Sequence, residues 1–346
     1  MGIAPTRGSD PPPFKAGRDL PDPTLRAMTS SLILVNLGTT RTPTPQGVRD
    51  FLREFLGDPM VVDWPAWVWR PILNGMVLPI RPHRVARLYA SIWTEEGAPL
   101  RVGTERIAAG IRDRVDPPVH VRVAYRYGEP GLAETVAQAS KEGPVTVVSL
   151  FPHQTASTTG TIDELVRRTV GARASADPEV IRVLHPEPDD PGFIEALAGR
   201  WEEALGEADV EPEHVVLSYH GIPTRHDRRE GGVYRTGCER TSRAFLARIG
   251  WPEAQATTAF QSRFGPEPWL RPATDDTLES LARAGIRRLA VVTPGFITEG
   301  LETVEEIGEE GKEIFLKAGG RSLVRVGCVE DHPAFVESLA RLGQRG

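Results

Sequence analysis

Cysteine is scarce in this chain, and the placement of the two residues excludes several classes of protein. The 346 residues include only Cys238 and Cys328, which stand far apart and form no CxxC pair. Two thiols cannot build the disulfide framework of a small secreted domain, and a self-contained iron–sulfur cluster usually needs four thiolates. The sequence therefore predicts a protein of the reducing cytosol without an iron–sulfur cluster, in which Cys238 packs as a small apolar residue.

The chain also lacks an excess of basic charge and a long apolar run. Lys and Arg number 41 against 47 Asp and Glu, a net charge of -6, so we expect no nucleic-acid partner. No apolar run reaches the roughly 20 residues that a transmembrane helix needs. Residues 1–30 are rich in proline and lack a signal-peptide core, so we expect a disordered leader rather than a targeting segment.

Several common catalytic signatures are also absent. No GxGxxG or GxxxxGK[ST] follows a strand-like run, which argues against a nucleotide-phosphate cradle. Neither HExxH nor a GxSxG elbow occurs, which argues against a zinc protease and a serine hydrolase.

Short apolar runs alternate with helical patterns from Ser31 onward. The run 31–38 ends on glycine, and residues 47–56 then carry apolar side chains at helical spacing. Further strand-like runs occupy residues 119–128, 144–153, 180–186, 214–221 and 286–296. This alternation predicts parallel sheets covered by helices on both faces.

The two halves of the chain are similar to each other. Residues 32–39 have a counterpart in 215–222, and residues 145–165 resemble 289–307: strand, proline, small-residue turn, acidic helix. We therefore expect two similar α/β lobes with a ligand between them, at the carboxyl ends of the strands. The expected division is 31–170, 171–325, and a C-terminal helix within 326–346 that packs back on the first lobe.

One segment breaks the alternation. Residues 61–84 combine Trp64, Trp67 and Trp69 with large aliphatic, basic and proline residues. One interpretation is a core helix between loops, because buried aromatics are common. The other is an apolar lip on the pocket of a large flat ligand, which touches a membrane surface through its tryptophans and arginines.

A titratable imidazole stands where an apolar strand ends. His220 closes the run that begins at residue 214, and Gly221 and Pro223 turn the chain sharply behind it. A neutral histidine accepts a proton near neutral pH, so His220 is a candidate general base. The position alone leaves a structural or surface histidine as the alternative.

Glutamates recur every four residues after a later strand. On a helix, Glu302, Glu306 and Glu310 stack on one face and repel each other by only about 0.2–0.5 kcal/mol per pair. A solvated face is therefore one interpretation. The other is a line of carboxylates that leads a divalent cation into the cleft.

Six blocks in chain order, between about residues 31 and 335, carry a family resemblance. They read LILVNLGTTRTP, LYASIWTEEGAPL, SLFPHQTASTTG, SYHGIPTRH, FQSRFGPEPWLRPATDDTLESL and VVTPGFITEGLETVEEI. Together they resemble ferrochelatase, the family that inserts ferrous iron into a porphyrin in haem synthesis. The resemblance implies a lyase with two Rossmann-like lobes, the type II chelatase fold. It also implies porphyrin and Fe²⁺ as substrates and no permanently bound cofactor.

The resemblance assigns roles by position. His220 and Glu302 match the family's catalytic pair, which also meets the metal. Glu306 and Glu310 extend from that pair as the candidate path of the iron. The positions that match substrate-binding residues are Leu37, Tyr89, Arg126, Tyr127 and Trp269.

Some positions depart from the family pattern. His153 stands where a glutamine is usual near the pocket rim, and Glu299 with Gly300 stands where Asp-Cys or Asp-His is common. The sequence GGVY replaces G-D-P-Y at residues 231–234. None of these changes touches His220 or Glu302.

The resemblance also suggests the substrate and the setting. Leu37 and the IWTEEGAPL block resemble the branch that uses protoporphyrin IX, with coproporphyrin III as the alternative. A sirohydrochlorin chelatase and a non-catalytic porphyrin or haem carrier are further alternatives. We expect a cytoplasmic monomer or homodimer that contacts the inner face of a membrane peripherally through residues 61–84.

Overall fold

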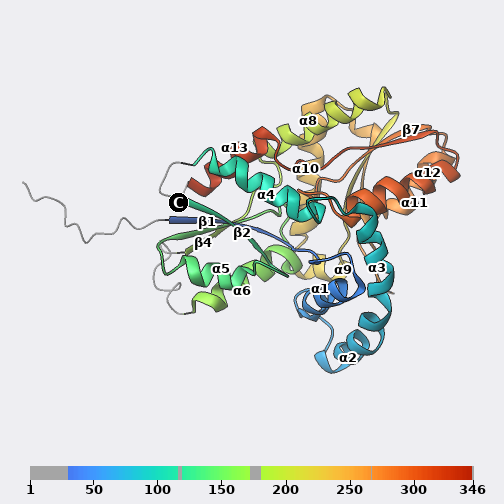
Figure 1. The fold of residues 1–346 in the computed structure, drawn as a ribbon. Helices are drawn as coiled ribbons and strands as arrows, with labels where there is room; N and C mark the ends of the chain where they lie inside the picture. Colours follow the sequence, from blue (N-terminus) through green and yellow to red (C-terminus); the bar gives the residue numbers. More distant parts are fainter. Residues whose placement is uncertain (1–29, 116–118, 172–180, 266, 345–346) are drawn as a thin grey trace, which may run out of the picture.

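Two parallel sheets form the framework of the protein. The computed structural model describes residues 30–115, 119–171, 181–265 and 267–344, so the expected leader lies outside the described residues, apart from Ser30. The first sheet has the order β2-β1-β3-β4 and the second the order β6-β5-β7-β8, with every pairing parallel (Figure 1). The strands are β1 Ser30–Asn36, β2 Val119–Tyr125, β3 Val145–Ser149, β4 Ile181–Leu184, β5 His214–His220, β6 Ala256–Gln261, β7 Arg288–Val292 and β8 Ser322–Arg325.

The matching strand orders confirm the expected pair of similar α/β lobes. Strand β1 occupies the place in its sheet that β5 occupies in the other, and β3 corresponds to β7. These are the pairs that the internal similarity of the sequence had linked. Parallel strands need crossover connections, and helices supply most of them.

The helices cover both faces of the sheets. They are α1 Pro45–Gly57, α2 Ala66–Ile72, α3 Leu78–Ile92, α4 Pro99–Arg112, α5 Leu132–Ala139, α6 Thr161–Val170, α8 Pro191–Ala208, α9 Thr224–Arg229, α10 Val233–Ile249, α11 Thr274–Arg283, α12 Lys312–Lys317 and α13 Pro333–Gln344. Three π-helical segments, η1 Leu73–Val77, η2 Ala156–Gly160 and η4 Leu301–Gly311, and one 3₁₀ turn, η3 Glu253–Gln255, complete the described elements.

A shared core joins the two lobes. In β1, Leu32 and Leu34 face one side of the sheet while Ile33 and Val35 face the other, as expected for a strand buried on both faces. The cluster that contains Leu34 also contains Leu217 of β5 and residues of α4, α8, α10 and α13. The lobes therefore pack against each other through apolar side chains, which fixes how their strand ends meet.

The boundary expected at residue 170 falls too early. Strand β4 pairs with β3 and so belongs to the first sheet. It has only four residues and none is fully buried, so its sequence gave no sign of which sheet it would join. Strands β6 and β8 were not singled out in the sequence either. Helix α13 packs on α8 and also contacts α4 and β3 (Figure 1).

The lip, residues 61–84, has two different faces. On one side Trp69, Leu73, Val77 and Leu78 form a small core with partly buried residues of α1. On the other side Trp64, Trp67, Met76 and Ile80 are exposed, with Trp67 at 81% of its full exposure. The buried side agrees with the core-helix interpretation, and contact with a ligand or a membrane stays a prediction. Among the described residues, no helix has the length and apolar character needed to cross a bilayer.

Candidate active site at the strand ends

The two equivalent central strands end close to each other. Leu37 directly follows β1, and His220 is the last residue of β5. The Asn36 side chain donates hydrogen bonds to Thr104 Oγ1 at 3.0 Å and to Thr298 Oγ1, in the turn after β7, at 3.2 Å. This buried contact links the end of the first sheet to the second lobe, so the side chains after both strands border the same region.

A glycine follows each of these strand ends because the backbone is crowded there. A Cβ on Gly38, whose φ is +104°, would lie 1.7 Å from the Tyr127 carbonyl oxygen. A Cβ on Gly221 would lie 2.8 Å from the Gln261 carbonyl oxygen and 3.1 Å from the Trp269 ring. Only glycine permits both turns without a shift of the backbone.

His220 is held in one orientation and one tautomer. Its Nδ1 lies 2.6 Å from the Gly221 carbonyl oxygen, which can only accept, so Nδ1 carries the proton of the neutral ring. The Nε2 lone pair is therefore left available as a proton acceptor. The Tyr234 hydroxyl donates to the His220 carbonyl at 2.6 Å, and the imidazole lies beside Trp269 and Phe296, with ring centroids 6.5 and 6.3 Å away.

Glu302 lies in the first turn of η4, within electrostatic reach of His220. Burial raises the pKa of the Glu302 carboxyl, and this effect outweighs a backbone hydrogen bond and the opposing charge of His220. Tyr89 of α3 approaches from the first lobe. Burial raises its pKa, and the charge of Glu302 raises it further. Groups from both lobes thus converge on one partly buried site.

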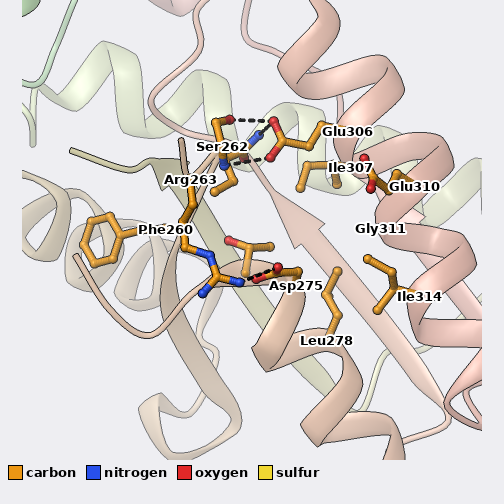
Figure 2. Close-up of a pocket in the computed structure, with 12 residues that line it drawn as sticks. Phe260, Ser262, Arg263, Asp275, Leu278, Glu306, Ile307, Glu310, Gly311 and Ile314 are labelled. Atoms are coloured by element: carbon orange, nitrogen blue, oxygen red, sulfur yellow. Dashed lines mark hydrogen bonds and ion pairs between the residues drawn. The ribbon is translucent and has the colours of Figure 1, made fainter. Parts of the chain in front are cut away.

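The Glu306 carboxylate is held at the end of β6, and the path of the iron past Glu306 and Glu310 stays a prediction. Figure 2 shows Glu306 turned to the end of β6, where it accepts hydrogen bonds from the Ser262 amide at 2.7 Å and the Ser262 hydroxyl at 2.5 Å. Gln261 Nε2 donates a third at 3.2 Å. Glu306 lies on η4, which has the i→i+5 bonding of a π-helix, and its charge contributes to raising the pKa of Glu302.

Both glutamates line a separate cavity of about 330 Å³. Its walls come from η4, α11 and the end of β6, and neither His220 nor Glu302 is among the lining residues. Ser262 adopts a left-handed φ of +64° there, a strained backbone that its two bonds to Glu306 help to hold.

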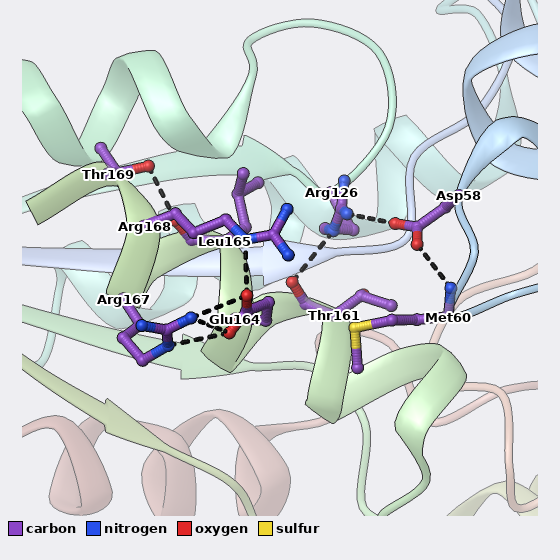
Figure 3. A network of polar contacts seen from close by, with 9 residues as sticks. All are labelled: Asp58, Met60, Arg126, Thr161, Glu164, Leu165, Arg167, Arg168 and Thr169. Atoms are coloured by element: carbon purple, nitrogen blue, oxygen red, sulfur yellow. Dashed lines mark hydrogen bonds and ion pairs between the residues drawn. The ribbon is translucent and has the colours of Figure 1, made fainter. Parts of the chain in front are cut away.

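Arg126 and Tyr127 are held by Asp58. The Arg126 guanidinium forms an ion pair with the Asp58 carboxylate and donates from Nε to the Thr161 carbonyl at 3.2 Å (Figure 3). The Tyr127 hydroxyl donates to Asp58 at 3.0 Å. The ring of Tyr127 is only 1% exposed and packs on Phe55, so it lies beneath the surface of the site in this conformation.

Leu37 and Trp269 are both half-buried at the site. The Trp269 indole donates to the Phe264 carbonyl at 2.9 Å, which fixes the ring beside His220. Their binding roles, like those of Tyr89, Arg126 and Tyr127, stay predictions. Two residues that support the site, Asp58 and Tyr234, were missed. Asp58 lies in no local sequence pattern, whereas Tyr234 stood in the GGVY block, which shares its first glycine and its tyrosine with G-D-P-Y.

His153 was expected near the pocket rim, and that placement is wrong. The residue is buried between the lobes, where its Nε2 lies 2.8 Å from Thr241 Oγ1 of α10 and its ring meets Tyr219 edge-on. Burial lowers its pKa to about 3. Cys238 and Cys328 are both free and buried.

No metal cage of three or more His, Cys, Asp or Glu side chains exists within the described part of the chain. A pair such as His220 and Glu302 leaves most coordination positions open, which suits an ion that passes through the site as a substrate.

Comparison with known proteins agrees with this geometry. A family model described as Ferrochelatase matches residues 29–345. Ferrochelatase of Pectobacterium atrosepticum is 40% identical over 314 residues, which cover 90% of this chain and 96% of that protein. Ferrochelatase of Bordetella pertussis is 39% identical over 341 residues, which cover 97% and 90%.

A solved structure shares the fold at low sequence identity. It is SirB from Bacillus subtilis with Fe³⁺, with a TM-score of 0.57, 14% identity, and coverage of 92% of this chain and 95% of that one. This likeness and the two parallel sheets confirm the expected chelatase fold. The chain belongs to the ferrochelatase family, lyases that insert iron into a porphyrin in haem biosynthesis.

Proposed function

We propose that this protein inserts Fe²⁺ into protoporphyrin IX between its two lobes, with release of two protons. The observation that carries the proposal is the fixed tautomer of His220. Its Nδ1 hydrogen bond to the Gly221 carbonyl leaves Nε2 as a proton acceptor in the region where both central strands end.

Metal insertion requires the two inner N–H protons of the porphyrin to leave. Neutral His220 accepts a pyrrole proton at Nε2, and the carboxylate of Glu302 stabilises the resulting imidazolium. Because burial raises the pKa of Glu302, its carboxyl titrates closer to neutral pH than an exposed one and is suited to pass the proton on.

A flat macrocycle shields its nitrogen lone pairs, so the ring has to bend before the metal enters. Contacts between the protein and remote parts of the ligand offset the energy of such a distortion, which is about 1–5 kcal/mol. We assign those contacts to Leu37, Tyr89 and Trp269 around the site and to the lip. Asp58 holds Arg126 and Tyr127, the other two predicted binding residues, in a fixed arrangement.

Substitution of the proposed base tests the mechanism. We expect H220A to abolish iron insertion while the porphyrin still binds, as seen by its absorbance shift. H120A, which removes a 60% exposed histidine side chain on β2, is the matched control and should keep full activity. Near-native turnover of H220A would show that the base is assigned wrongly.

The residue at position 37 favours protoporphyrin IX as the substrate. A leucine at position 37 offers an apolar contact to the vinyl edge, whereas the four propionates of coproporphyrin III favour a more polar wall. Turnover on the two porphyrins, measured side by side, decides between them. The same assay with Fe²⁺ or Zn²⁺ distinguishes an enzyme from a porphyrin carrier, and sirohydrochlorin as substrate tests the remaining alternative.

The exposed face of the lip supports a peripheral membrane contact. Trp64, Trp67, Met76 and Ile80 are the side chains that would enter the interface of the inner leaflet in a cytoplasmic monomer or homodimer. Co-sedimentation with phospholipid vesicles should fall in a W67S variant if this surface binds the membrane.

A further inference from the structure

Asp63 connects the lip to the second lobe. It stands near the start of the lip, and only 16% of its side chain is exposed. Its carboxylate accepts hydrogen bonds from both terminal nitrogens of Arg225, one of them at 2.5 Å. Arg229 Nη1 lies 2.9 Å and His226 Nε2 lies 3.1 Å from the same carboxylate. All three partners belong to α9, which begins four residues after His220.

The same arginine reaches the loop that carries Trp269. Arg225 Nε donates to Glu267 at 2.6 Å, so one guanidinium bridges Asp63 of the first lobe and Glu267 of the second. Elsewhere on the lip, Arg81 stacks over the ring of Phe264 at 4.6 Å. The lip therefore contacts the second lobe at two points, one ionic and one cation–π.

The Asp63 contacts have the features of a strong ion pair. Burial alone would raise the pKa of this carboxyl, but hydrogen bonds from Arg225 and Arg229, together with the nearby His226 ring, outweigh it and hold the pKa well below its usual range. Bidentate arginine–carboxylate geometry adds directional strength that a single exposed contact lacks. An exposed pair within one helix, such as Glu164 with Arg167, typically contributes little.

We infer that Asp63 is a positioning residue for porphyrin binding, because its contacts with α9 hold the lip against the second lobe over the site. The inference rests on the proposed function, since it takes the porphyrin to lie between the lobes. When the contacts are lost, the lip moves away from α9 more often and the porphyrin leaves faster. The chemistry at His220 is unaffected once the ring is bound.

The test compares D63N with E195Q in the full chain. Glu195 also binds an arginine with both oxygens, Arg248, but the pair joins α8 and α10 away from the site. Protein loaded with protoporphyrin IX is mixed with excess serum albumin, and the transfer is followed by fluorescence. We expect release from D63N to be about tenfold faster than from the wild type, with an equal rise in KM for the porphyrin. The kcat and the KM for iron stay unchanged, and E195Q behaves as the wild type.

Salt and conservative substitution separate an ionic contact from a general structural effect. Raising NaCl to about 0.5 M should accelerate release from the wild type but not from D63N, because salt screens ion pairs. D63E should recover most of the slow release, and R229Q, which removes one contact, should show a smaller acceleration. Release from D63N at the wild-type rate overturns the inference, as does equal salt dependence in both proteins.

A second measurement is independent of catalysis and of porphyrin. Hydrogen exchange of residues 64–80 in the ligand-free protein should be faster in D63N than in E195Q. Equal exchange overturns the inference even if iron insertion is confirmed. Failure of the wild type to bind any porphyrin would instead reject the proposed function and leave the exchange result to decide the role of Asp63.

Discussion

Replacement of His153 by glutamine should change how the stability of this protein depends on pH. The Thr241 hydroxyl donates its proton to the Pro188 carbonyl at 2.5 Å. It therefore accepts a hydrogen bond from the Nε2–H of His153. The Nδ1 atom has no hydrogen-bond partner among the residues that the structure describes, and the ring lies beside Tyr219 and Tyr234. A second proton would therefore create a buried, unpaired charge, and burial lowers the pKa to about 3.

The sign and size of the effect follow from this depressed pKa. Below the ordinary histidine pKa of about 6.5 the unfolded chain binds a proton, while the folded protein does not until about pH 3. The stability that neutral His153 contributes is thus complete above pH 6.5 and is lost as the pH falls. At pH 5 the free energy of unfolding is lower by about 2 kcal/mol. The reason is that pH 5 lies about 1.5 pH units below the pKa of a histidine in the unfolded chain, and each unit corresponds to about 1.4 kcal/mol.

Urea unfolding followed by tryptophan fluorescence at pH 7 and pH 5 measures this loss. The difference between the two free energies of unfolding should be about 2 kcal/mol smaller in H153Q than in the wild type. Glutamine also changes the packing, but that change is present at both pH values and cancels. H120Q, at an exposed histidine, should keep the wild-type difference. His214 and His332 also have lowered pKa values, and their contributions are common to all three proteins.

An equal pH dependence in H153Q and the wild type would refute this reasoning. It would mean that His153 is protonated in the folded protein at pH 5, and hence that a proton acceptor reaches Nδ1. An NMR titration of the His153 ring then decides the point directly, since a pKa near 6 is incompatible with the buried, unpartnered site.

Three further outcomes are expected. E302Q should lose iron insertion yet unfold at higher urea than the wild type at pH 8, because burial raises the pKa of Glu302 and stability falls as the pH rises through it. D58N should lower the free energy of unfolding by about 3–5 kcal/mol, since it leaves the charge of Arg126 unpaired, and a D58N/R126Q double variant should lose less. An E306Q/E310Q variant should raise the KM for iron more than that for porphyrin; equal effects would exclude both residues from the metal's path.

Much of the fold was predictable because it depends on local pattern. Apolar runs that are buried on both faces, such as 31–38 and 214–221, predicted parallel strands, and their similarity predicted two equivalent sheets. Strand β4 was placed in the wrong lobe because it is short and partly exposed, so only its pairing with β3 shows where it belongs.

The local pattern of residues was enough to show that His220 ends a strand and precedes a glycine, and family resemblance paired it with Glu302. Which atoms of these residues form hydrogen bonds depends on how the folded chain packs around them. The tertiary structure joined Asp63 to α9, Asp58 to Arg126 and His153 to Thr241 across long stretches of chain. It also placed the Glu306 carboxylate against Ser262. Periodicity encodes which face of an element is buried, whereas pairing between distant side chains is set by how the packed elements bring them together.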